Sequence, residues 1–129
     1  MIGGKPNVLY EKAYAFGVQV VRAYQFLSRE KQEYVLSKQL LRCGTSIGAN
    51  IAEANGALSD ADFSAKISIN YKECLETKYW LHLLHDTEYL TALMFESLYH
   101  DADELSKMLF ATLRSTNRVK TTKNLPDTC

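Results

Sequence analysis

Apolar residues recur every three to four positions through most of the chain, in four blocks that short polar stretches separate. This spacing predicts amphipathic helices, because 3.6 residues per turn bring such positions onto one face. The helices are expected over residues 8–28, 34–55, 59–86 and 91–115. Each would be roughly 30–40 Å long at 1.5 Å per residue. Helices of matched length with short connections predict an all-α protein, an antiparallel up-and-down four-helix bundle forming a single domain over residues 1–115.

Residue types at the ends of the blocks support these bounds. Asn7 precedes the first block and has a side chain suited to cap a helix N-terminus. Asn55 and Gly56 follow the second block, and both tolerate the left-handed conformation that often ends a helix. Ser59, with Asp62 three positions later, resembles a capping box with aspartate in place of glutamate.

Glycine lies well inside the second block, although each glycine costs about 0.5–1 kcal/mol relative to alanine in a helix. Gly44, Gly48 and Ala52 are spaced four apart and form a row almost free of side chains. Such a row allows a neighbouring backbone to come close, which predicts tight helix packing. The alternative is that the helix breaks or kinks between Gly44 and Gly48.

Aromatic residues in the first and third blocks exceed what one thin core needs. The first block carries the stripe Tyr10, Tyr14, Gly17, Val21 and Tyr24. Further aromatic residues of the two blocks are Phe26, Tyr79 and Trp80. Aromatic residues favour interfaces, so these positions predict a homo-oligomer, with a bulky monomeric core as the alternative.

Composition is that of a globular protein, 47% apolar and 23% charged, with zero net charge. The charges are distributed unevenly. Residues 1–58 carry seven Lys/Arg against four Asp/Glu, residues 59–105 three against ten, and residues 106–129 five against one. Such an asymmetry can guide the assembly of an oligomer or offer a basic surface to a polyanion. A solvated surface without a partner is the alternative.

Sequence features typical of metal, redox and membrane proteins are missing from the pattern. Three distant cysteines (Cys43, Cys74 and Cys129) disfavour zinc and disulfides and fit a reducing cytoplasm. No apolar stretch is long enough to span a bilayer, and the N-terminus lacks a signal-peptide core, so no membrane partner is expected. The histidines do not form the Glu-x-x-His pairs of di-iron bundles. We therefore expect no metal, no cofactor and no catalytic residues, and a protein that is not an enzyme.

Two long motifs resemble a known family. The first is Ser46-Ile47-Gly48-Ala49-Asn50-Ile51-Ala52-Glu53-Ala54, and the second comprises Lys72-Glu73, Glu76-Thr77 and Tyr79-Trp80-Leu81. Together they are similar to the bacterial four helix bundle protein family, some members of which are encoded by intervening sequences in 23S rRNA genes. The similarity is strongest over residues 37–84.

The resemblance implies a left-handed up-and-down bundle that assembles as a homopentamer. It also implies kinship with the accessory protein of diversity-generating retroelements, a basic pentameric barrel that binds a reverse transcriptase and nucleic acid. The present chain differs from that relative in having zero net charge. No established biochemical activity comes with the intervening-sequence proteins themselves.

Polar residues within the family motifs suggest a network inside the bundle. The candidates are Asn50, Glu53, Glu73, Glu76 and Lys78. A satisfied network between the second and third helices, or at a subunit interface, would fix register. The alternative is a ligand-binding or acid–base cluster, since paired carboxylates can do such work.

Basic residues near two parts of the chain are the candidates for nucleic-acid contact. They are Lys38 and Arg42, with Lys31 nearby, and Arg114, Arg118, Lys120 and Lys123. Residues 116–129 are expected to form a basic, disordered tail. In the alternative interpretation this tail is solvated and does not contact nucleic acid. Asp101, Asp103 and Glu104 are expected to form a solvated acidic turn.

The sequence thus predicts a non-enzymatic, oligomeric helical bundle in the cytoplasm. Its role would be that of a scaffold for RNA, DNA, a nucleic-acid enzyme or another protein. The alternative is a small-molecule-binding or catalytic bundle that uses the cluster of Asn50, Glu53, Glu73 and Glu76.

Overall fold

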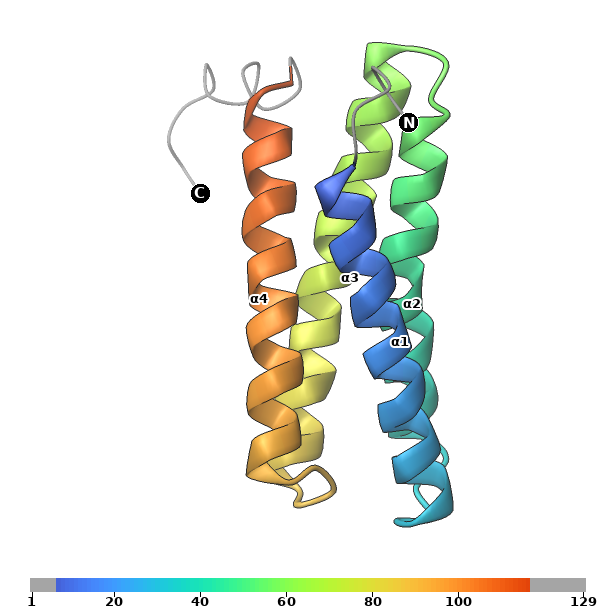
Figure 1. Cartoon of the computed structure of the whole chain (residues 1–129), viewed down its shortest axis with the longest axis vertical. Helices are drawn as coiled ribbons and strands as arrows, with labels where there is room; N and C mark the ends of the chain where they lie inside the picture. Colours follow the sequence, from blue (N-terminus) through green and yellow to red (C-terminus); the bar gives the residue numbers. More distant parts are fainter. Residues whose placement is uncertain (1–6, 117–129) are drawn as a thin grey trace.

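The computed structural model describes residues 7–116, and these form four α-helices without a strand. The helices are α1 (Val8–Arg29), α2 (Leu36–Asn55), α3 (Asp60–Asp86) and α4 (Ala92–Arg114). They run up and down beside one another, each antiparallel to the next (Figure 1). The prediction of an all-α four-helix bundle is confirmed. The expected bounds differ from the observed ones by one or two residues at the ends.

Each helix packs against the one before and after it in the chain, and α4 packs more loosely back against α1. One face of every helix is buried in a single core. Its largest fully buried side chains include Phe16, Leu27, Leu40, Ile47, Leu81 and Leu105. None of the described helices is long and apolar enough to cross a bilayer.

Short polar side chains cap the N-termini of three of the helices. Asn7 accepts a hydrogen bond from the Tyr10 amide at 2.9 Å, and its own amide donates to Asn55 at 2.8 Å. Ser59 and Thr91 accept from the third residue of α3 and α4 in the same way. Asn7 thus caps α1 and also joins the start of α1 to the end of α2.

The start of α2 depends on Glu33, a residue expected only in the polar connection. The Glu33 carboxylate accepts hydrogen bonds from the backbone amides of Val35 (3.2 Å), Leu36 (2.9 Å) and Ser37 (2.7 Å). Burial alone would raise the pKa of Glu33, but these backbone hydrogen bonds outweigh it and lower the pKa below the usual 4.5. A negative charge at a helix N-terminus is also favoured by the helix dipole.

The structure decides two questions that the sequence left open: whether α2 is continuous, and which stripe of α1 faces the core. Helix α2 is continuous through Gly44 and Gly48, so the alternative of a broken helix was wrong. The tyrosine-rich stripe of α1 is not the core-facing one. The core is reached instead from Ala13, Phe16, Val20, Ala23 and Leu27. Helix α1 therefore carries two apolar stripes, of which one is left at the surface.

The predictions for Arg118, Lys120 and Lys123, and for the tail as a whole, fall on residues 117–129, which lie outside the described residues.

Candidate functional site

The tightest helix contact lies at Gly44, where α2 crosses α1. A Cβ atom added at Gly44 would lie 2.8 Å and 2.9 Å from the two Cγ atoms of Val20. Val20 is fully buried and β-branched, so it has no other rotamer to move into without disturbing the core. Glycine therefore fits this position without a shift of Val20, whereas any larger residue requires one, and the packing outweighs the helix cost of glycine.

The small-residue row leaves this contact as it continues along α2. A Cβ atom at Gly48 would lie 3.6 Å from the Ala13 carbonyl oxygen, which is ordinary van der Waals contact. Ala52, one turn further, is exposed. The row predicted as one packing strip therefore divides into a buried end at Gly44 and an open end at Gly48 and Ala52.

The open end forms one wall of an apolar groove between α1 and α2, with a volume of about 530 Å³. The α2 wall is made of Thr45, Gly48, Ala49 and Ala52, and the α1 wall includes Tyr10, Tyr14, Gly17, Val18, Val21 and Arg22. Nothing lies within 4 Å of a Cβ atom placed on Gly17. Small residues thus keep the groove hollow from both sides.

Large apolar side chains stand exposed along the rim of the groove. Tyr14 is 63% exposed, and Val18 and Val21 are each 38% exposed. Tyr10 lies beside Tyr14, with ring centroids 6.3 Å apart. A continuous apolar surface of this kind on a globular protein marks an interaction site. Part of the tyrosine-rich stripe that the sequence indicated for α1 therefore lines a surface groove.

Polar residues gather on the opposite flank of α2, where it meets α3. Arg42 donates a hydrogen bond to Glu76 and lies 3.7 Å from Glu73. Burial raises the pKa of Glu73, with the neighbouring Glu76 adding to the effect. The Trp80 indole N–H, 3.1 Å away, and Arg42 together lower the pKa of Glu76 despite partial burial. One guanidinium thus lies between two carboxylates and pairs with both.

The other residues of the predicted network do not all join this cluster. Glu53 pairs with Lys66 at 2.9 Å, nearer the other end of α2. Lys78 faces away from α2 and pairs with Asp103 of α4 at 2.7 Å, so its inclusion in one network was wrong. Asn50 is half-buried on α2. The predicted cluster is a set of separate ion pairs, which hold α2 to α3 and α3 to α4.

Asn70 is a buried polar residue on the face of α3 that packs into the core. Its side chain is fully buried and donates to the Ile47 carbonyl of α2 at 3.0 Å. Its oxygen has no hydrogen-bond partner among residues 7–116. The contact fixes the register of α3 against α2. Its only sequence signal was an asparagine in an otherwise apolar helical stripe.

The basic candidates for nucleic-acid contact do not form one patch in the described residues. Lys38 and Arg42 lie on α2, but the charge of Arg42 is used by Glu73 and Glu76. Arg114 lies at the end of α4, where its guanidinium sits 5.9 Å from the Phe110 ring centroid.

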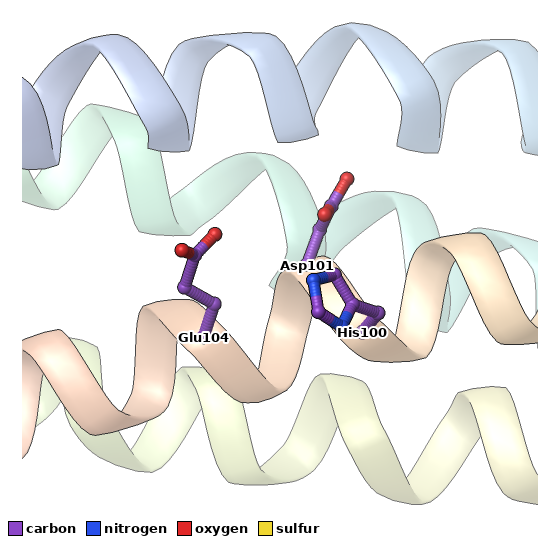
Figure 2. A group of neighbouring side chains, drawn as sticks. All are labelled: His100, Asp101 and Glu104. Atoms are coloured by element: carbon purple, nitrogen blue, oxygen red, sulfur yellow. The ribbon is translucent and has the colours of Figure 1, made fainter.

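A group on α4 offers metal-ligand atoms: His100, Asp101 and Glu104, within 4.8 Å of one another (Figure 2). Both carboxylates have partners, since Gln19 donates to Asp101 and Lys12 lies 3.2 Å from Glu104. A lysine at that distance competes with a cation. Asp101, Asp103 and Glu104 lie in the middle of α4, inside the predicted helix, and are half-buried with side-chain partners rather than fully solvated.

The buried thiols are poor nucleophiles. Burial raises the pKa of Cys43 to about 11 and that of Cys74 to about 12, so both stay protonated near neutral pH. Cys74 lies 3.1 Å from the Ala102 carbonyl, and both cysteines fill core space between helices.

Comparison with known proteins agrees with the family that the motifs of α2 and α3 resemble. The family model described as 23S rRNA-intervening sequence protein matches residues 5–111. The chain is similar to a solved structure from Bacteroides thetaiotaomicron, a protein with unknown function from the S23 ribosomal protein family. The two share 49% sequence identity and a TM-score of 0.83, over 84% of this chain and 97% of that chain. Comparison with curated proteins gave no match.

Two flanks of α2 are thus chemically distinct. On the α3 flank the charged side chains pair within the same chain, and one buried oxygen, that of Asn70, is left without a partner among the described residues, whereas the α1 flank ends in an open apolar groove. Among the described residues, that groove combines a hollow with exposed apolar side chains, so a partner seated there would bury apolar surface.

Proposed function

The chain belongs to the family of 23S rRNA-intervening sequence proteins, and from this premise we propose that it is a non-enzymatic helical-bundle scaffold that associates with further copies of itself through the α1–α2 groove. The observation that carries the proposal is the groove itself. Its floor is kept hollow by Gly17 and Gly48, and its rim exposes Tyr14 and two valines. Burying such a surface gains about 25 cal/mol per Å² of apolar area.

A catalytic role has less support from the arrangement of polar groups. Glu73 and Glu76 share Arg42 as a partner, and Cys43 is buried with a raised pKa. An acid–base or nucleophilic centre needs a reactive group that substrate can reach. The solved relative is itself described as a protein with unknown function.

The proposal includes the number of copies that the family resemblance implies, which is five. Five chains of 14.6 kDa give about 73 kDa. Light scattering after size exclusion measures this mass directly. A mass of one chain at high protein concentration would overturn the proposal.

Gly17→Leu tests whether the groove is the contact surface. A leucine there meets no atom within 4 Å at its Cβ and replaces a helix-weakening glycine, so the monomer fold is kept while the groove is filled. We expect helical circular dichroism like wild type and the mass of a single chain. Ala15→Leu is the matched control, because Ala15 is exposed on the same helix and does not line the groove. An oligomer unchanged by Gly17→Leu would contradict the proposed surface.

A further inference from the structure

A groove that pairs copies of a chain needs a defined surface on the second copy. Resting on the proposed function, we propose that the α1–α2 groove of one copy receives the outer face of α3 of the next copy, so that the contact joins two different surfaces. The face consists of Leu75 and Tyr79, one turn apart, together with Ile69, which lies nearer the start of α3 and about 80° around the helix from Tyr79; it is called here the outer α3 patch. These three side chains are 44%, 58% and 53% exposed.

Shape is the first reason for this pairing. The groove is concave because its walls are built from glycine and alanine. Two such grooves placed face to face would leave an unfilled space, which forfeits dispersion contacts. The outer α3 patch is convex, since Leu75 and Tyr79 lie four residues apart and form a ridge on the outside of a helix. Ridges of one helix pack into grooves between others in this way.

Length is the second reason. The groove follows α1 from Tyr10 to Gln25, which is about 22 Å at 1.5 Å per residue. The outer α3 patch extends from Ile69 to Tyr79, about 15 Å by the same measure, so it fits within the groove.

Aromatic content is the third reason. Tyr79 packs edge-on against Trp80, with ring centroids 5.1 Å apart, and Trp80 is tied to Glu76 by its indole N–H. Tyr79 is thus an exposed aromatic side chain supported from beneath by a second ring. Rigid, supported aromatic side chains are the residues that most often dominate binding energy at interfaces.

Charge is the fourth reason. The segment that builds the groove helices, residues 1–58, has seven basic and four acidic residues, and Arg22 lines the groove. Helix α3 itself has five acidic residues (Asp60, Asp62, Glu73, Glu76 and Asp86) and three basic ones (Lys66, Lys72 and Lys78). Groove-to-groove pairing brings two basic segments together, whereas groove-to-α3 pairing joins basic to acidic.

The other exposed apolar side chains of the described residues are less suited to fill the groove. Leu58 and Val35 lie outside the helices, at opposite ends of the bundle. Leu93 lies in the first turn of α4. Phe110 is 44% exposed, but its ring already packs against Tyr71, and the Arg114 guanidinium lies 5.9 Å from its centroid. The outer α3 patch is the one that runs along the middle of a helix.

Because the two surfaces differ, each copy can give its α3 and receive another, so the contact repeats from copy to copy. An isologous pairing would stop at two copies. Whether the assembly stops at two copies or continues to more therefore depends on which surfaces meet.

Cysteine cross-linking distinguishes the two arrangements. The probes are Ala49→Cys in the groove wall and Lys72→Cys on the exposed face of α3 near the patch, alone and combined, in a Cys129→Ser chain. Cys43 and Cys74 are buried and do not react. A short bismaleimide should join chains of the double variant into covalent multimers and leave both single variants as monomers on denaturing gels.

Covalent dimers of either single variant would overturn the proposal, since they show that like surfaces meet. So would a double variant that stays uncross-linked while light scattering of the same sample shows an oligomer. If light scattering of the same sample shows single chains, the proposed function fails and this inference fails with it. The two failures are therefore told apart by the mass.

Discussion

The two flanks of α2 differ in whether their side chains find partners within the same chain. On the α3 flank, Arg42 serves Glu73 and Glu76, and Asn70 reaches the Ile47 carbonyl across the helix pair. On the α1 flank, Gly44 is fully packed against Val20, but the row then opens at Gly48. Polar groups satisfied within one chain indicate structure, whereas apolar surface left uncovered indicates a partner. This difference is the reason we propose the α1 flank, rather than the α3 flank, as the interaction surface.

The largest expected effect is at the buried end of the glycine row. Gly44→Leu should leave the chain unfolded, because even a Cβ would lie 2.8 Å from Val20 and overpacking commonly costs about 1–3 kcal/mol or more. Gly44→Ala should fold with a free energy of unfolding lower by about 1–3 kcal/mol. Urea denaturation measures both.

Val20→Ala combined with Gly44→Ala is the control for that clash. It should recover part of the loss, because the Val20 methyl groups are the atoms met. Equal stability of Gly44→Ala and wild type would show that the helices can move apart freely, and the contrast between the two ends of the row would be lost.

The next effect is at the open end. Gly48→Leu should keep the fold, since its Cβ makes only ordinary contact with Ala13, and should weaken self-association by about 100-fold, or ~2.7 kcal/mol. Sedimentation over a dilution series gives the dissociation constant. Association as tight as that of wild type would contradict the proposal that Gly44 serves the fold and Gly48 serves self-association.

A smaller effect is expected at the Glu33 cap. Glu33→Gln should lower the free energy of unfolding by about 1 kcal/mol at neutral pH, because the charge that attracts three backbone amides is lost. Since the folded pKa is lowered, wild type should lose this contribution as the pH falls from above the ordinary value of 4.5 through the folded value. The variant should lack that acid-dependent step in urea titrations between neutral and acid pH. An identical pH dependence would exclude Glu33 as the cap.

The smallest effect is expected on the α3 flank. Arg42→Met should reduce the free energy of unfolding by less than about 1 kcal/mol, since the Arg42 side chain is half exposed. The pKa of Glu73 is already raised by burial, so the loss should grow as rising pH ionises Glu73 and should vanish in acid. Self-association should not change, which separates this flank from the groove. A loss of association in Arg42→Met would move the interface to the α3 side.

Sequence periodicity was sufficient for the number of helices and nearly so for their ends, because caps such as Asn7 and Ser59 are local signals. It was insufficient for deciding which of the two stripes on α1 faces the core. The core stripe from Ala13 to Leu27 and the stripe from Tyr10 to Tyr24 both have helical spacing, and only tertiary packing distinguishes them.

The polar residues show the same limit. Glu73, Glu76 and Lys78 are close in sequence, but one turn of the helix sends Lys78 toward α4 and the glutamates toward α2. The role of Glu33 depends on a turn in which Gln32 has φ of 53°, and no periodic pattern reports such a turn. The proposed interaction surface spans two helices, so no single sequence motif contains it.

The most direct test of the account is whether the groove is covered in solution. Ala49→Cys places a thiol inside the groove on α2, and Ala15→Cys places one outside the groove on α1; each variant is made in the Cys129→Ser chain. At high protein concentration, and with Gly17 unchanged, the account predicts that a maleimide modifies the groove thiol much more slowly than the outside thiol. When Gly17→Leu is added to each variant, the two thiols should react at equal rates. Equal rates for the two thiols in concentrated protein without Gly17→Leu would contradict it.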